Sequence, residues 1–153
     1  MKMDSTTSNT KFSPIVVLFV GSNPSNASVM DVASHGSTKS SKILTEWLRS
    51  IPADRLPIYI NVMNKKTVGN RPLKQSEIKA NLELLSQRLE TIKPEYVVAL
   101  GKSASTALTL LGKPHYEMPH PSGRNRKLND KKFVEGKIKG LTEFVSKPIQ
   151  ESN

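Results

Sequence analysis

Three polar loops hold the residues best suited to chemistry in this chain, and each loop follows a short apolar run. Asn23 lies in the loop Gly21–Ser28 (GSNPSNAS), Asn61 ends a second apolar run, and His120 stands between two prolines after a third. An amide does not take up a proton near neutral pH, so Asn23 is suited to orienting a water molecule and unsuited to acting as a general base. Asn61 presents a hydrogen-bond donor and an acceptor together. Polar loops that follow apolar strands in this way indicate a ligand-binding site.

Each loop also has a purely structural interpretation. The segment GSNPS is compatible with a simple tight turn, because Gly and Asn-Pro are turn formers. Asn61 is compatible with a structural role at a strand end, and His120 with a capping role. If the preceding runs are parallel neighbouring strands, however, all three loops gather at one edge of a sheet, where ligands bind in open α/β folds.

The elements that must position these loops alternate along the chain. Apolar runs predict buried strands at Ile15–Val20, Pro57–Val62 and Tyr96–Leu100, and a short one at Tyr116–Met118. Apolar residues at helical spacing predict helices at Ser40–Arg49, at Ser76–Ile92 with Ser76 as N-cap, at Ser103–Leu111 between Gly101 and Gly112, and at about Lys131–Val145. This alternation predicts a three-layer α/β/α sandwich around a central, mainly parallel four-stranded sheet.

Length and composition narrow the class of protein. The 153 residues suit one domain, predicted at 14–147, with a flexible N-terminal tail at 1–13 and a C-terminal tail at 148–153. The absence of cysteine excludes disulfides, a Cys nucleophile and metal sites built on thiolates. No apolar run approaches the ~20 residues of a membrane helix or resembles a signal peptide, so we expect a soluble, intracellular protein of the cytoplasm, nucleoid or nucleus.

The charge is strongly positive and uneven. The chain has a formal net charge of +10, and residues 113–139 alone hold eight basic and three acidic side chains. Lys and Arg gain affinity for polyanions by releasing counterions from phosphates, so this stretch indicates a nucleic-acid partner. A solvated basic surface is the alternative.

Taken together, the motifs resemble those of the uracil-DNA glycosylase superfamily. Residues 21–25 (GSNPS) match its first motif, an apolar strand leading into Gly-x-Asn/Asp-Pro, and residues 120–125 (HPSGRN) match its second. Between them, residues 58–61 (IYIN) look like the strand whose terminal Asn reads the base, and residues 97–104 (VVALGKSA) resemble the strand–Gly–helix element before the second motif. The order and approximate spacing hold from about residue 15 to residue 145.

The resemblance implies a monofunctional DNA glycosylase that hydrolyses the N-glycosidic bond of uracil or a modified pyrimidine flipped out of DNA. His120 would donate to the departing base and Asn23 would orient the water, the two catalytic roles. Asn61 would read the base, with Gly21, Ser22 and Pro24 around it. No cofactor or metal is implied, because the site residues are polar side chains of the chain itself. We expect DNA as partner, no membrane contact, and a monomer.

The sequence departs from the family where a base would stack. Residues 26–41 hold no Phe, Tyr or Trp, so His35 is the flat ring available for stacking, with a surface histidine as the alternative. The small residues after Pro24 suggest a roomier pocket and a bulky modified pyrimidine.

The resemblance also implies a set of DNA contacts. Arg124 occupies the position from which the family inserts a side chain into the duplex, and Lys102 is interpreted as a phosphate contact at a helix N-terminus. The predicted DNA-binding residues are Lys102, Ser122, Gly123, Arg124, Arg126 and Lys127. Two rival functions stay open: a non-catalytic DNA-binding protein that retains the fold, and a nucleoside or nucleotide N-glycosidase.

Overall fold

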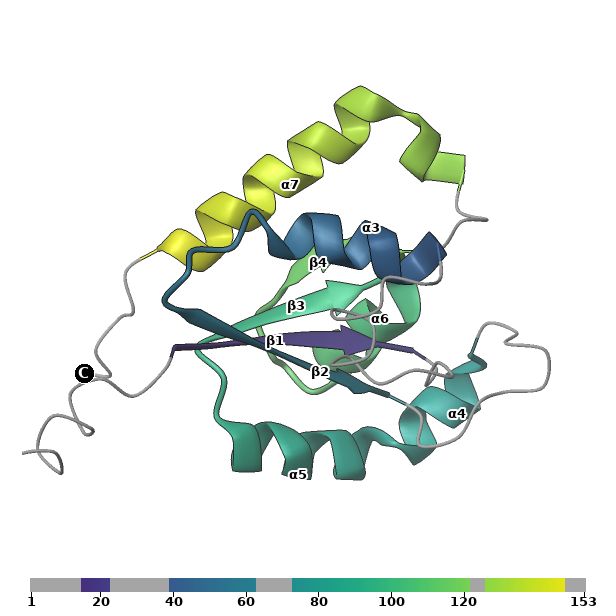
Figure 1. Ribbon diagram of the computed structural model, residues 1–153. Coiled ribbons are helices and arrows are strands. Elements are labelled where there is room, and N and C mark those ends of the chain that lie inside the picture. Colours follow the sequence, from purple (N-terminus) through teal and green to yellow (C-terminus); the bar gives the residue numbers. More distant parts are fainter. Residues whose placement is uncertain (1–14, 23–38, 63–72, 122–125, 148–153) are drawn as a thin grey trace, which may run out of the picture.

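Four parallel strands form the centre of the protein. A computed structural model describes residues 15–22, 39–62, 73–121 and 126–147 of the chain. The strands are β1 (Ile15–Gly21), β2 (Arg55–Asn61), β3 (Tyr96–Leu100) and β4 (Tyr116–Met118), in the spatial order β2-β1-β3-β4. All three strand pairings are parallel, so the arrowheads in Figure 1 point toward the same end of the sheet. The central strands β1 and β3 are the most buried, as their apolar sequences require.

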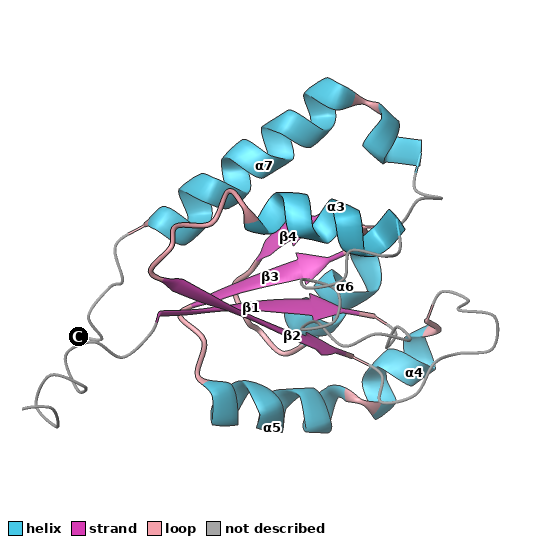
Figure 2. Cartoon of the chain, viewed as in Figure 1, coloured by secondary structure: helices cyan, strands magenta, loops and turns pink. Residues whose placement is uncertain are grey.

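Helices cover both faces of this sheet (Figure 2). One face carries α3 (Lys39–Leu48) and α7 (Lys131–Ser146), and the other carries α4 (Gln75–Ala80), α5 (Leu82–Ile92) and α6 (Lys102–Leu110). A short 3-10 helix, η2 (Arg126–Asn129), precedes α7. The predicted three-layer α/β/α fold around a four-stranded sheet is therefore confirmed. Within the described ranges, no helix is long and apolar enough to span a membrane.

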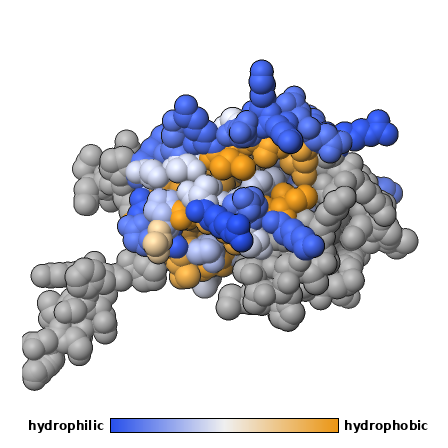
Figure 3. Space-filling view, turned by 45° about the horizontal axis from the view of Figure 1, so that its top comes forward, coloured by the Kyte–Doolittle hydropathy of each residue, from blue (hydrophilic) through white to orange (hydrophobic). Residues whose placement is uncertain are grey.

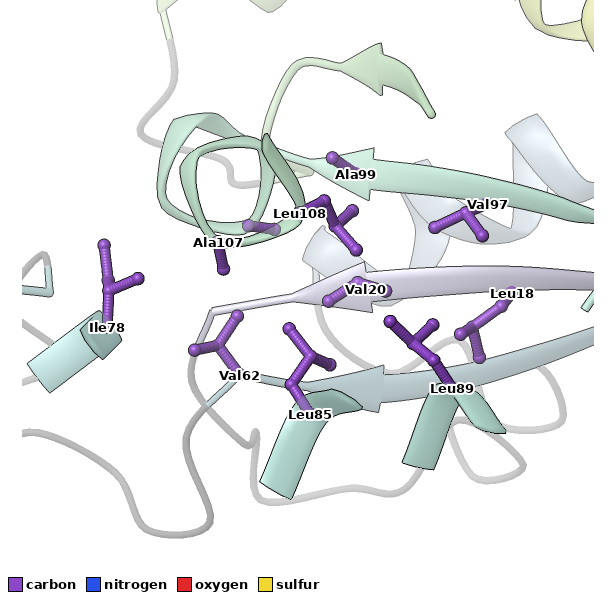
Figure 4. Close-up of a cluster of buried hydrophobic side chains, with 11 residues drawn as sticks. Leu18, Val20, Val62, Ile78, Leu85, Leu89, Val97, Ala99, Ala107 and Leu108 are labelled. Atoms are coloured by element: carbon purple, nitrogen blue, oxygen red, sulfur yellow. The ribbon is translucent and has the colours of Figure 1, made fainter. Parts of the chain in front are cut away.

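Two hydrophobic cores lie on opposite sides of the sheet because strand side chains alternate between its faces. Leu18 and Val20 point into the core beneath α4, α5 and α6, with Leu85 and Leu108 fully buried against them (Figure 4). On the other face, strand residues such as Phe19 pack with residues of α3 and α7; this core comprises Val17, Phe19, Leu44, Trp47, Tyr96, Val98, Leu100, Met118, Leu141 and Val145.

The predicted helix at 76–92 proves to be two helices. The helix is interrupted at Asn81, which has φ −106° and ψ 3°. The side-chain amide of Asn81 donates a hydrogen bond to the Glu77 carbonyl at 2.8 Å. The N-cap of α4 is Lys74 rather than Ser76, and the Glu77 carboxylate accepts the Lys74 N–H at 2.8 Å. The apolar periodicity hides this break, because Ile78 and Leu85 on either side of it enter the same core.

The helix after β3 ends as its two glycines predict. Gly101 is the N-cap of α6, and Gly112 lies just beyond the last turn with φ +70°. The Gly112 N–H donates to the Thr109 carbonyl at 3.0 Å and the Lys113 N–H donates to the Leu108 carbonyl at 2.9 Å, the hydrogen-bond pair of a Schellman motif. The predicted tails at 1–13 and 148–153 lie outside the described residues.

Candidate functional site

The carboxyl ends of the four strands form one edge of the sheet, and polar side chains from the two outer strands lie on it. Asn61 ends β2, Gly21 ends β1, Gly101 directly follows β3, and His120 comes two residues after β4. Two backbone hydrogen bonds connect these strand ends. The Val62 N–H donates to the Gly21 carbonyl at 2.9 Å, and the Gly101 N–H donates to the Met118 carbonyl at 2.8 Å. The structure thus brings Gly21, Asn61 and His120 to the same edge.

The Asn61 amide packs over Gly21. Gly21 and Asn61 are direct partners in the β1–β2 register. A Cβ placed on Gly21 would lie 2.7 Å from Asn61 Oδ1 and 2.6 Å from the hydroxyl of Tyr59, closer than real Cβ atoms come to other atoms. Gly21 is required here for this close approach of the Asn61 and Tyr59 side chains.

The carbonyl oxygen of the Asn61 side chain is buried and, among the described residues, has no hydrogen-bond partner. A buried polar atom without a partner is unfavourable by roughly 1–3 kcal/mol, so such atoms are uncommon away from functional sites. The Asn61 backbone is held in place, because Arg88 donates to its carbonyl at 3.1 Å. Asn61 Oδ1 is therefore an acceptor that no described residue engages.

Tyr59 stands beside this acceptor on the same face of β2. Its ring packs with the core under α3 and α7, and burial raises the pKa of its hydroxyl above the ordinary value of 10.0. The hydroxyl is therefore neutral at physiological pH. The Tyr59 side chain thus lies next to Asn61, with its ring packed against the core.

His120 packs over Gly101 on the opposite side of the edge. A Cβ on Gly101 would lie 3.2 Å from His120 Cβ and 3.4 Å from His120 Cδ2. Gly101 also has φ +94°, a conformation that L side chains rarely adopt. The positive φ therefore favours glycine strongly, and a side chain here would also force His120 to shift by a few tenths of an ångström.

The imidazole of His120 is neutral at pH 7. His120 retains an exposed side, yet the protein around its ring is dense enough that burial lowers its pKa below the ordinary 6.5. A neutral imidazole can donate one hydrogen bond while accepting another. His120 is thus equipped to donate to an oxygen on which negative charge develops.

Asn61 and His120 flank the ends of the two central strands. Their strands are the outer ones of the sheet, about 14 Å apart if adjacent strands lie at the usual spacing of about 4.8 Å. The Asn61 side chain lies over Gly21 of β1, and the His120 side chain lies over Gly101 after β3. The distance between the two side chains is therefore shorter than the distance between their strands.

Several predicted site residues lie outside the described part of the chain. These are Asn23, Pro24, His35, Ser122, Gly123 and Arg124. Ser22, the last described residue after β1, lies directly beside Gly21 at the same edge. The assignments of water orientation, stacking and duplex insertion therefore stay predictions from the sequence.

The structure describes three of the predicted basic DNA contacts, and they lie at two places near this edge. Lys102 is exposed at the first position of α6, directly after Gly101. Arg126 and Lys127 are exposed in η2, which begins six residues after His120. Among the described residues, no group of three or more His, Asp and Glu side chains could hold a metal ion.

Three residues of this edge were missed by the sequence interpretation. Tyr59 lies two positions before Asn61, a spacing that puts both on one face of a strand and could have identified it. Gly101 was interpreted only as a helix start, although it also makes room for His120. Arg88 gave no signal, because its contact with Asn61 joins two elements 27 residues apart.

The comparison with known families agrees with this geometry. The family model of the uracil DNA glycosylase superfamily matches residues 12–138, most of the chain, a range that includes both sequence motifs at 21–25 and 120–125. No curated protein sequence matches the chain. Members of this superfamily act on DNA, which supports DNA as the partner and a glycosylase-like function. Because the family model matches most of the chain, this protein belongs to the uracil-DNA glycosylase superfamily.

Proposed function

We propose that this protein is a monofunctional DNA glycosylase that hydrolyses the N-glycosidic bond of uracil or a modified pyrimidine flipped out of DNA. One observation carries the proposal: the Asn61 amide and the His120 imidazole lie over glycines at the same edge of the sheet, with the Asn61 acceptor left without a partner among the described residues. The superfamily match supports a glycosylase-like function in general.

Asn61 would select the base by its Watson–Crick edge. The N3–H of a uracil-type ring can donate to Asn61 Oδ1, and the Asn61 amide nitrogen can donate to O4 of the same ring. Cytosine carries an acceptor at N3 and an amino group at C4, which reverses this pattern. A site built on Asn61 therefore favours uracil-like pyrimidines.

His120 would stabilise the leaving base. When the bond between the base N1 and the sugar C1′ breaks, its electron pair goes to the base, and negative charge spreads to the ring oxygens. A neutral His120 donating to one of these oxygens stabilises that charge without proton transfer. The oxygen of a water molecule then bonds to C1′ and releases a proton to solvent, a step for which Asn23 is the proposed orienting residue.

The test is excision from a panel of oligonucleotides that carry uracil, 5-hydroxymethyluracil or other modified pyrimidines, followed by alkaline cleavage of abasic sites. The wild type should release at least one uracil-like base. His120→Ala should slow release by roughly 10²–10³, the effect of losing one oriented donor to a developing anion. DNA affinity should change little.

His115 offers a matched control. Its imidazole is held away from the proposed base site by Ser105 Oγ at 2.8 Å and by the Lys113 carbonyl at 2.8 Å. His115→Ala should retain wild-type excision. Equal rates for His120→Ala and wild type would remove His120 from the reaction. DNA binding without excision of any base would support the non-catalytic alternative, and release from free nucleosides alone would support the nucleosidase.

A further inference from the structure

The N-terminal half of α7 contributes no fully buried residue, and the preceding η2 reaches the core through its partly buried Leu128. The buried residues of α7 are Leu141 and Val145, both in its C-terminal half, whereas residues 131–136 are exposed apart from the partly buried Val134. We call residues 126–136 the η2–α7 arm. In Figure 1 the arm lies toward the end of the sheet to which the strands point, and it follows His120 closely in the chain.

The arm combines positive charge with an exposed aromatic ring. Its basic residues Arg126, Lys127, Lys131 and Lys132 are all exposed, against the acidic Asp130 and Glu135. Figure 3 shows hydrophilic side chains along this upper side of the molecule, with hydrophobic patches directly beneath them. Phe133 is 36% exposed and is the sole aromatic among the exposed large hydrophobic residues of the described part; the others are Leu56 and Leu110.

The backbone that carries Phe133 is fixed by the start of α7. Asp130 is the N-cap, and its carboxylate accepts the Phe133 N–H at 3.1 Å while its carbonyl accepts the Val134 N–H at 3.0 Å. The ring therefore projects from an ordered turn. An exposed aromatic ring on an ordered backbone, in a segment with exposed basic side chains, is a combination with which proteins hold unpaired nucleotides, since the bases stack and the phosphates pair with the cations.

We propose that the η2–α7 arm binds the single-stranded DNA next to the target nucleotide, with Phe133 stacking on an unpaired base and Arg126, Lys127, Lys131 and Lys132 contacting the flanking phosphates. This inference rests on the proposed function for its choice of DNA. It adds a stacking residue outside both motifs, and it implies that a region of unpaired DNA larger than the flipped base is bound.

The test measures binding of the full chain to a short oligothymidine by fluorescence anisotropy, with alkaline cleavage of the same sample to verify that no thymine is released during the measurement. Phe133→Ala should weaken binding by roughly five- to a hundred-fold, the range for losing one stacked base. Its salt dependence should stay unchanged because no charge is lost. The double variant Lys131→Ala/Lys132→Ala should instead lower the slope of log affinity against log salt concentration by about 0.7 per lost phosphate contact. Leu110→Ala, the matched change at an exposed hydrophobic residue on α6, should bind as wild type does.

An oligomer of the same length with abasic nucleotides separates stacking from charge. Replacing the thymines by abasic sites keeps the phosphates, so it should weaken the wild type by about the same factor as Phe133→Ala and leave Phe133→Ala itself unaffected. Phe133→Trp should restore binding, and its exposed indole should be quenched by oligothymidine, whereas the buried Trp47 of the wild type should not respond.

Two results would overturn the proposal. One is wild-type oligothymidine affinity for Phe133→Ala, and the other is an equal loss on abasic DNA for Phe133→Ala and wild type. Both results are independent of excision. If the proposed function is wrong, no base is released but Phe133 still contributes to DNA binding. If this inference is wrong, bases are released but Phe133→Ala binds DNA as the wild type does.

Discussion

His120 lies directly over Gly101, whose missing side chain leaves the space that the imidazole occupies. A Cβ on Gly101 would come within 3.2 Å of His120 Cβ. The histidine of one motif is thus positioned by a glycine of a separate strand–helix junction. Asn61 and Gly21 repeat this relationship on the other side of the edge, so each polar side chain depends on a neighbouring glycine.

Gly101→Ala should displace His120 and slow base excision. The substitution also strains the backbone, because Gly101 has φ +94°. Gly112→Ala is the matched control, since Gly112 has φ +70° but a methyl group there would meet no atom within 4 Å. Both variants should lose stability by about 1 kcal/mol or more, and excision by the folded protein should fall for Gly101→Ala alone. Equal rates per folded molecule would contradict the role given to Gly101.

Asn61→Asp should change which base is released. The substitution replaces the amide donor by an acceptor and adds a charge at a buried position, so discrimination between uracil-like and cytosine-like edges should shift. Gly21→Ala should produce a related defect, because its methyl group would overlap with Asn61 Oδ1 and the Tyr59 hydroxyl. Relative rates on uracil-type and cytosine-type oligonucleotides measure the effect. An unaltered substrate profile in Asn61→Asp would remove Asn61 from the base site.

The pH dependence of stability should report the lowered pKa of His120. Burial lowers this pKa below 6.5, so between the folded value and 6.5 the unfolded chain binds more protons at this position than the folded chain. The stability that His120 contributes is complete above pH 6.5 and is lost as the pH falls through the folded pKa. Urea unfolding of wild type and His120→Gln between about pH 5 and pH 8 measures the difference. A stability advantage of wild type over His120→Gln that grows as the pH falls, or a raised pKa by NMR, would contradict the lowered pKa of His120.

Two glycines of α7 should respond to the same substitution with opposite signs. Gly136→Ala meets nothing within 4 Å and should stabilise the protein by about 0.5–1 kcal/mol, the helix propensity gain of alanine. A methyl group on Gly140 would overlap with the Tyr116 hydroxyl, which is held by a 2.9 Å bond to the Lys137 carbonyl. Gly140→Ala should therefore destabilise the protein. Thermal unfolding of the two variants compares them, and a stabilised Gly140→Ala would show that Tyr116 moves freely.

The layered fold and the two motif positions were predictable from the sequence because they depend on local patterns. Continuous apolar runs such as Tyr96–Leu100 identify buried parallel strands, and the spacing of leucines identifies the helices between them. Gly101 and Gly112 bound α6 by their own backbone preferences. Polar loops after such strands must lie at one edge whatever the strand order, so the approximate place of the site also followed.

Tertiary structure alone decided which side chains meet at that edge. The strand order β2-β1-β3-β4 places Asn61 beside Gly21 and His120 beside Gly101, and no local pattern encodes these neighbours. The break at Asn81 was hidden because both short helices bury the same apolar face. The exposure of Phe133 was likewise decided by packing: α7 is amphipathic, but its fully buried residues, Leu141 and Val145, both lie in its C-terminal half.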